Sequence, residues 1–94
     1  MRIEFTAKVF RENDQFVSHA PELDVSSCGA TPEEARANLD EAVRLFLEAA
    51  ADSNDLEALL EDCGYTRGSD QGWKPPQPLF AESAAVHLPE HAQT

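Results

Sequence analysis

The sequence predicts an α+β fold in which one long helix packs on one face of a small antiparallel sheet. Three observations support this class. Apolar and polar residues alternate in short runs between residues 2 and 30, as in half-buried strands. The apolar period then changes to 3.6 residues between residues 32 and 51, as in an amphipathic helix. A helix-start signal stands at the change, and it reads Gly29-Ala30-Thr31-Pro32-Glu33-Glu34-Ala35.

Three strands are expected first, at residues 2–10, 15–20 and 25–30. In the first, the residues on the apolar face are Ile3, Phe5, Ala7 and Val9. A polar turn at residues 11–14 links it to the second strand, and Pro21-Glu22-Leu23-Asp24 links the second strand to the third. Such short links between successive strands predict an antiparallel meander.

The long helix is expected at residues 32–51. Thr31 is suited to the N-cap position, and Pro32 to the first helical position, where its missing N–H costs nothing. Glu34 is placed to accept from the Thr31 N–H and close a capping box. Glu33 and Glu34 both favour the positive end of the helix dipole. The stripe expected to face the sheet contains Ala35, Leu39, Ala42, Val43, Phe46, Leu47 and Ala50.

The second half of the chain predicts a shorter helix and a last strand. Ser53-Asn54-Asp55 begins the helix and Gly64 ends it. Residues 66–78 are expected to form a loop in which Trp73 is a packing anchor. The fourth strand is expected at Leu79–Leu88, followed by a frayed tail at 89–94. The expected order is thus β-β-β-α-α-β, with a core at residues 1–64 and, at 65–94, a loop, a fourth strand and a tail. Two alternatives stay open for residues 66–94, which either fold alone or order only on binding or dimerisation.

The sheet face opposite the helix is expected to carry Lys8, Phe10, Val17 and His19. This mixture is not polar enough for a face that only meets water. We therefore expect a dimer interface or a partner site there.

Size and charge limit the classes of partner. A chain of 94 residues is marginally stable alone, so a homo-dimer or higher homo-oligomer is expected. The net charge of −11 argues against autonomous binding of nucleic acid or of an anionic membrane, and it favours a basic partner. Cys28 and Cys63 are expected to be free thiols, and no secretory leader or membrane span is expected. These features predict a cytoplasmic protein.

The residues that carry acid–base or metal chemistry form no convincing site. Glu4 with Glu34 or Glu41 is the formal candidate for a two-metal nuclease, but each has a simpler structural explanation. His19 and Cys28 supply at most two ligands of a zinc site. His87 and His91 lie four residues apart, but Pro89 separates them, so no helix places them on one face. No catalytic residue, cofactor or metal site is therefore expected.

The chain resembles the HicB family of antitoxins. The resemblance rests on His19-Ala20-Pro21-Glu22-Leu23, on the run Gly29 to Ala35 quoted above, and on Asn38-Leu39 with Glu41-Ala42. It covers residues 3–50, about half of the chain. It implies a fold similar to a truncated ribonuclease H layer. It also implies a partner, a small basic toxin that cleaves messenger RNA, whose active site the antitoxin covers.

The sequence departs from the family pattern in two places. Asp24-Val25 follows the Pro-Glu-Leu turn, where family members often have Pro-Gly. Residues 52–94 resemble none of the C-terminal DNA-binding modules of the family, and they hold two bases, Arg67 and Lys74, against eight acidic residues. No separate DNA-binding domain is therefore expected.

These expectations lead to a functional hypothesis of a non-enzymatic antitoxin that binds and occludes a toxin. Negative charge would steer it to its basic partner, with Glu22 and Asp24 on the strand-linking turn as candidate contacts. Two alternatives stay open. One is a stand-alone HicB-like oligomer of regulatory role without a toxin, and the other is a degenerate hydrolase.

Overall fold

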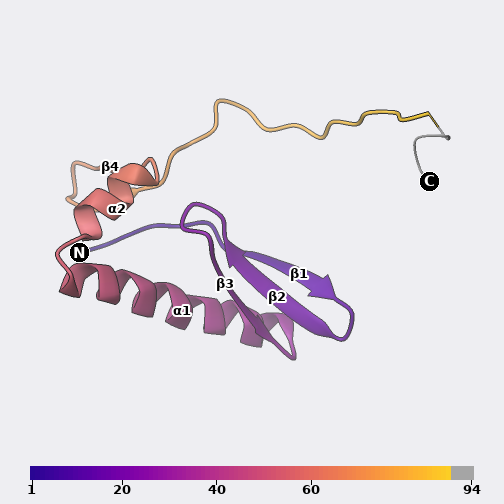
Figure 1. The fold of residues 1–94 in the computed structure, drawn as a ribbon, viewed down its shortest axis with the longest axis horizontal. Helices are drawn as coiled ribbons and strands as arrows, with labels where there is room; N and C mark the ends of the chain where they lie inside the picture. The colour runs from indigo at the N-terminus through magenta and orange to yellow at the C-terminus, as the bar shows by residue number, and fades with distance from the viewer. Residues whose placement is uncertain (90–94) are drawn as a thin grey trace.

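The computed structural model describes residues 1–89 and has an α+β fold (Figure 1). A three-stranded antiparallel sheet of order β1-β2-β3 lies against one long helix, and a short helix and a small two-stranded sheet follow. The elements are β1 (Lys8–Glu12), β2 (Gln15–Ala20), β3 (Val25–Gly29), α1 (Pro32–Asp52), α2 (Leu56–Asp62), β4 (Thr66–Arg67) and β5 (Trp73–Lys74).

The predicted meander is confirmed, but its first strand is shifted. β1 begins at Lys8 and extends to Glu12, so the expected turn at 11–14 shrinks to Asn13-Asp14, with Asn13 at φ 58°. β2 ends at Ala20 because Pro21 follows it and has no N–H to donate. Residues before Lys8 therefore lack an antiparallel partner, and they run on as a separate extended segment.

The predicted long helix is confirmed, with one change at its cap. The Glu34 N–H donates to the Thr31 hydroxyl at 3.0 Å, as expected for an N-cap. The Glu34 carboxylate, however, accepts from the Ala30 N–H at 3.2 Å instead of from Thr31. The side chain of Glu34 thus pairs with the backbone N–H of Ala30, the residue that precedes the N-cap.

Gly29 lets the start of α1 lie directly against the end of β3. A Cβ atom at this position would lie 2.6 Å from the Ala35 backbone nitrogen, closer than two such atoms can approach. Just along α1, the Asn38 side-chain amide donates to the Cys28 carbonyl at 2.8 Å. The glycine and the amide together fix helix and strand at close range.

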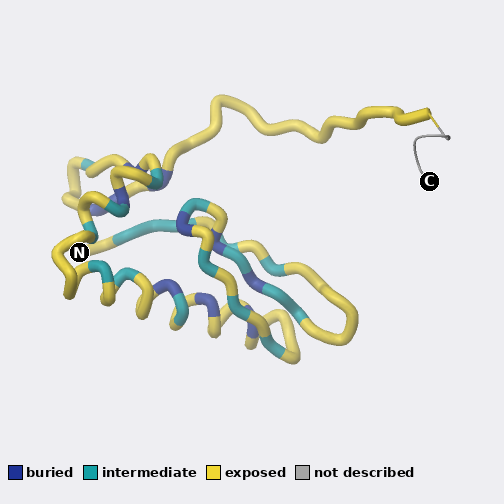
Figure 2. The backbone as a smooth tube through the Cα atoms, in the orientation of Figure 1, coloured by how far each residue is buried: buried dark blue, intermediate teal, exposed yellow. Residues whose placement is uncertain are grey.

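The core lies between the three-stranded sheet, α1 and the C-terminal hairpin, which consists of β4 and β5 (Figure 2). Its buried members are Ala20, Leu23, Leu39, Val43, Leu60, Tyr65 and Trp73. Two of these, Tyr65 and Trp73, lie beyond residue 64, so the core draws on more of the chain than residues 1–64. Phe46, expected in the buried stripe of α1, is instead 37% exposed at the edge of that stripe.

The C-terminal hairpin closes the core through Trp73. The expected loop at 66–78 contains the strands β4 and β5, and the expected role of Trp73 as a packing anchor is confirmed by its exposure of 4%. Trp73 forms a parallel bridge with Ile3. The backbone N–H of Trp73 donates to the Arg2 carbonyl at 2.7 Å, and the Trp73 carbonyl accepts from the Glu4 backbone N–H at 3.0 Å.

Tyr65 reinforces this closure. Its hydroxyl donates to the Glu4 carbonyl at 2.7 Å. Burial raises the pKa of Tyr65 to about 12, so the hydroxyl keeps its proton throughout the neutral range. The N-terminal segment is therefore held on the side of the hairpin by three hydrogen bonds.

The predicted fourth strand at Leu79–Leu88 is wrong. Residues 79–89 are exposed and belong to no strand. Pro75, Pro76 and Pro78 precede them and cannot donate to a ladder, so the chain leaves the sheet after Lys74. The extended run raises the radius of gyration to 16.9 Å, against about 12 Å for a compact chain of this length. Of the expected tail at 89–94, residues 90–94 lie outside the described part.

Within residues 1–89, no helix has the length and apolar character needed to cross a bilayer.

Gly29→Ala should destabilise the protein by about 1–3 kcal/mol, because the new methyl group meets rigid backbone. The midpoint of urea unfolding would measure this loss. Gly68→Ala is the matched control, since a methyl there meets first the side chains of Asp70 and Lys74 instead of rigid backbone and should cost less than Gly29→Ala. Equal effects of the two substitutions would contradict the packing argument.

Candidate functional site

Most residues of the helix-start motif contact their own chain. Thr31 and Glu34 cap α1, Ala35 is fully buried, and Asn38 bonds to β3. Pro32 and Glu33 are exposed in the first turn of α1. These side chains build the fold and leave little of the motif free for a partner.

The Pro21-Glu22-Leu23 turn is equally occupied. Leu23 is 5% exposed in the core, and Pro21 is exposed at the end of β2. The Glu22 carboxylate accepts two hydrogen bonds from Thr6, one from its N–H at 3.0 Å and one from its hydroxyl at 2.5 Å. Partial burial by itself raises the pKa of Glu22, but these bonds outweigh it and hold the pKa below its ordinary value. Glu22 therefore ties the N-terminal segment to the turn.

The sheet face opposite α1 is a mixed surface, as expected. Ala20 packs in the core with residues of α1, so alternate residues of β2 point away from the helix. The register pairs Phe10 with Val17 and Val17 with Cys28, which places an apolar row across all three strands. A second row pairs His19 with Lys8 and with Ser26. We call this surface the open face, and it consists of Lys8, Phe10, Val17, His19, Ser26 and Cys28.

Much of the open face is accessible. Phe10 is 53% exposed and Cys28 is exposed, whereas Val17 and His19 are half-buried. A half-exposed aromatic ring at the edge-strand end of a cross-strand apolar row is typical of a surface that meets another protein.

Asp24 lies at the rim of the open face. It has φ 54°, which turns the chain from the Pro-Glu-Leu turn into β3. Its carboxylate lies 3.1 Å from His19 Nε2, yet its side chain is 94% exposed. Of the two candidate contacts on this turn, Asp24 is thus accessible and Glu22 is engaged with Thr6.

The candidates for metal chemistry lie apart. Glu4 is 3.9 Å from Arg2, Glu34 caps α1, and Glu41 pairs with Arg44. Within residues 1–89, no three His, Cys, Asp or Glu side chains are grouped so that they could hold a metal ion. His87 is exposed, Cys28 and Cys63 are free thiols, and His91 lies outside the described residues.

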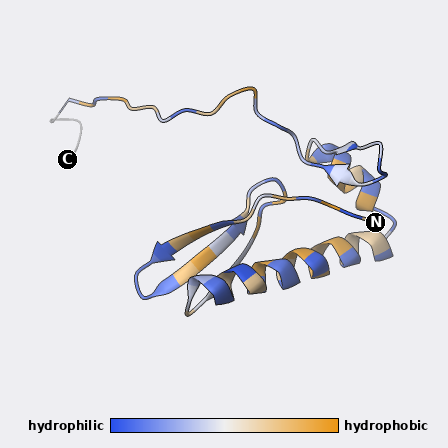
Figure 3. Cartoon of the chain, turned by 180° about the vertical axis from the view of Figure 1, so that it is seen from behind, coloured by the Kyte–Doolittle hydropathy of each residue, from blue (hydrophilic) through white to orange (hydrophobic). Residues whose placement is uncertain are grey.

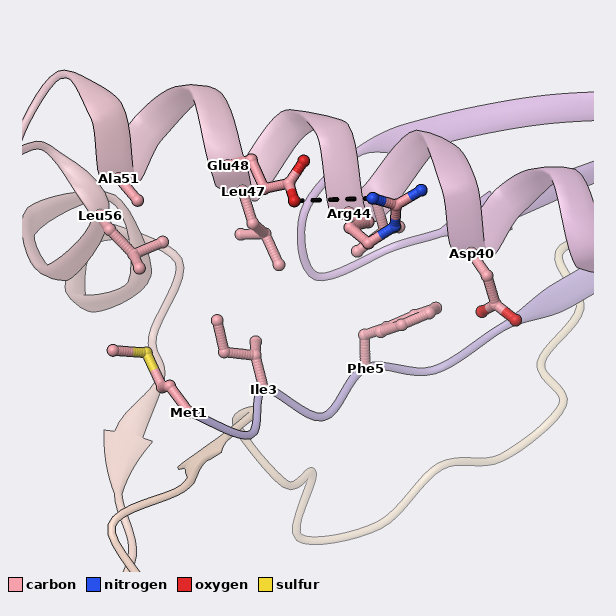
Figure 4. Close-up of a pocket in the computed structure, with 10 residues that line it drawn as sticks. Met1, Ile3, Phe5, Asp40, Arg44, Leu47, Glu48, Ala51 and Leu56 are labelled. Carbon is pink, nitrogen blue, oxygen red and sulfur yellow. Dashed lines mark ion pairs between the residues drawn. The ribbon is translucent and has the colours of Figure 1, made fainter.

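An apolar groove, which the sequence pattern did not indicate, opens between α1 and the N-terminal segment (Figure 4). Its volume is about 440 Å³. Ile3 and Phe5 line one side, and Val43, Leu47 and Leu56 line the other. Asp40, Arg44 and Glu48 stand at its edge. The groove arises because residues 1–7 leave the sheet to reach Trp73, a contact that links distant parts of the sequence.

Acidic residues gather where α1 ends and along α2, beside the groove. Five lie between residues 52 and 62, all exposed and with no base among them: Asp52, Asp55, Glu57, Glu61 and Asp62. Glu57 pairs with Arg67 at 2.9 Å. This end of the molecule therefore presents a negative surface.

Comparisons with known protein families, with characterised proteins and with solved structures find no match to this chain.

Glu22→Gln should lower the free energy of unfolding at pH 7 by about 1 kcal/mol, after allowance for the solvent exposure of the group. Because folding lowers the pKa of Glu22, its contribution is present above its ordinary value of 4.5 and is lost as the pH falls through the folded-state value. Urea titrations of both proteins between neutral and acid pH would measure this, and the two curves should converge at low pH.

Glu12→Gln is the control, because Glu12 is exposed on the β1–β2 hairpin. A difference between wild type and Glu22→Gln that persisted unchanged into acid would show that the charge of Glu22 does not act through Thr6.

Proposed function

We propose that this chain is a non-enzymatic, cytoplasmic antitoxin of the HicB type that binds a small basic toxin and occludes it. The observation that carries the proposal is the open face, where Phe10, Val17 and Cys28 form an apolar row on the side of the sheet away from α1. The resemblance of residues 21–42 to the family supports the same assignment, since those residues form β3 and the first half of α1, which packs on the antiparallel sheet.

Charge supports a basic partner. The chain carries 18 acidic and 7 basic residues, so its long-range field attracts cationic proteins and repels nucleic acid. A toxin that cleaves messenger RNA must contact phosphates through Lys and Arg side chains. An acidic protein can compete for that same surface, and complementary charge speeds its association.

The mechanism is steric occlusion. The apolar row of the open face would supply the desolvated centre of the interface, and Asp24 at the rim would meet a toxin base. Bound in this way, the protein keeps RNA away from the toxin without any chemical step of its own.

A stand-alone oligomer without a toxin is the second candidate. Exposed apolar side chains near the C-terminus favour this candidate, because binding to a basic toxin through charge does not explain them. They belong to Leu79, Phe80, Val86 and Leu88. Gene context separates the two candidates, because an antitoxin requires a small basic reading frame beside its own.

The test is co-expression with the small basic protein encoded beside this gene, followed by light scattering of the purified complex. We expect a stable complex and restored growth of cells that express the toxin. Failure of the wild-type chain to bind or protect would contradict the antitoxin proposal.

Phe10→Glu and Leu45→Glu form a matched pair that locates the interface. The two side chains are 53% and 54% exposed, but Leu45 lies on α1. Phe10→Glu should weaken toxin binding at least tenfold, in the range of an interface hot spot, while Leu45→Glu should leave it unchanged. The reverse result would move the interface to α1.

Asp24→Lys tests the electrostatic part. It should slow association with the toxin and flatten the dependence of the association rate on salt, since rim charges act mainly on that rate. Stopped-flow measurements at several salt concentrations would check this. An unchanged salt dependence would remove Asp24 from the interface.

A further inference from the structure

The C-terminal segment, residues 75–89, carries large apolar side chains that its own chain leaves exposed. Leu79 is fully exposed, and Phe80, Val86 and Leu88 are 76%, 86% and 64% exposed. The segment extends away from the rest of the molecule, and Figure 3 shows hydrophobic positions along it. No hydrogen bond within residues 1–89 involves it. Four such side chains in ten residues predict a surface that covers them.

The same chain offers an apolar surface that is open. The groove between the N-terminal segment and α1 has a volume of about 440 Å³, within the range of pockets that enclose a ligand. Figure 4 shows the Ile3, Phe5 and Leu47 side chains around the opening. An aromatic ring is the kind of group that fills such a space.

We propose that residues 79–88 of one copy dock in the groove of a second copy, with Phe80 as the anchor. In an extended chain, alternate side chains share a side, so Phe80, Ala84, Val86 and Leu88 would face the second copy together with the one acidic residue Glu82, while Leu79 would lie on the opposite side. The inference does not rest on the proposed function, because it uses neither the open face nor a toxin.

Charge favours a second copy as the occupant. The C-terminal segment contains one acidic residue, Glu82, and no Lys or Arg, whereas the other residues carry most of the net charge of −11. It is therefore a part of the chain that can approach an acidic copy with little repulsion. The same near-neutrality gives it no electrostatic attraction for a basic protein.

Chain stiffness favours the second copy over the groove of the same chain. Pro75 is buried, and Pro76 lies against Gly64 at the end of α2, which fixes where the segment departs. Pro75, Pro76 and Pro78 hold their own φ and keep the preceding residues extended, so residues 74–78 form a strut. Figure 1 shows this strut pointing away from α1. To reach its own groove the chain would have to reverse immediately after it.

Reciprocal docking closes the assembly. If each segment enters the other copy's groove, the contact is made twice and a two-fold dimer results. Because the contact is made twice, each partner buries about twice the area that one ten-residue segment covers. The buried area thus approaches the roughly 800 Å² per partner of a standard interface.

Light scattering of the purified full-length chain over a range of concentrations tests the proposal. The wild type should have about twice the mass of one chain, 10.3 kDa. Phe80→Ser, which removes the anchor, and Ala51→Arg, which places a large charged side chain at the groove, should each have the mass of one chain. Gln77→Ser and Ala49→Arg are the matched controls, since both residues are exposed and neither lines the groove. Both should remain dimeric.

Mixing the two monomeric variants keeps the test independent of misfolding. The Ala51→Arg chain retains its C-terminal segment, and the Phe80→Ser chain retains its groove, so the mixture should associate through one contact, more weakly than the wild type, in which the contact is made twice. A monomeric wild type, a dimeric Phe80→Ser variant, or a mixture whose mean mass at the highest concentration does not exceed that of the separate variants would each overturn the proposal. A monomer that expands on Phe80→Ser would show instead that the segment occupies its own groove.

Discussion

The close approach of α1 to β3 at Gly29 is the constraint on which the rest of the structure depends. Since only two residues separate the end of β3 from the start of α1, the helix must lie across one sheet face, and the Asn38 bond to the Cys28 carbonyl holds it there. That face becomes the core. The other face is left with Val17 at its centre and Phe10 beside it on the edge strand β1. The absence of a side chain at Gly29 thus allows the packing that hides one surface of the sheet and leaves the other exposed.

Local signals in the sequence were sufficient for the parts of the fold that depend on near neighbours. The Thr31-Pro32 cap, the helix that follows it, and the meander each depend on residues within a few positions of one another. The open face followed too, because period two places Lys8, Phe10, Val17 and His19 together once the hairpin is known.

The missed features all involve distant partners. Nothing near Trp73 in the sequence indicates that it pairs with Ile3, so the departure of residues 1–7 from the sheet, and the groove behind them, were not foreseen. The apolar alternation at Leu79–Leu88 suggested a strand, but a strand requires a neighbour, and Pro75 to Pro78 direct the chain away from the sheet edge. An apolar pattern indicates which side chains a segment could bury, but it does not indicate which surface would cover them.

The bridge between Ile3 and Trp73 has a consequence for the order in which the protein is made. The first few residues leave the ribosome long before the tryptophan does, and until it emerges the Arg2 and Glu4 backbone groups lack their partners. Contacts between such distant positions close slowly, since the entropy of the large intervening loop must be lost first. During translation the sheet and the long helix can therefore assemble early, while the core is sealed only after most of the chain has been synthesised.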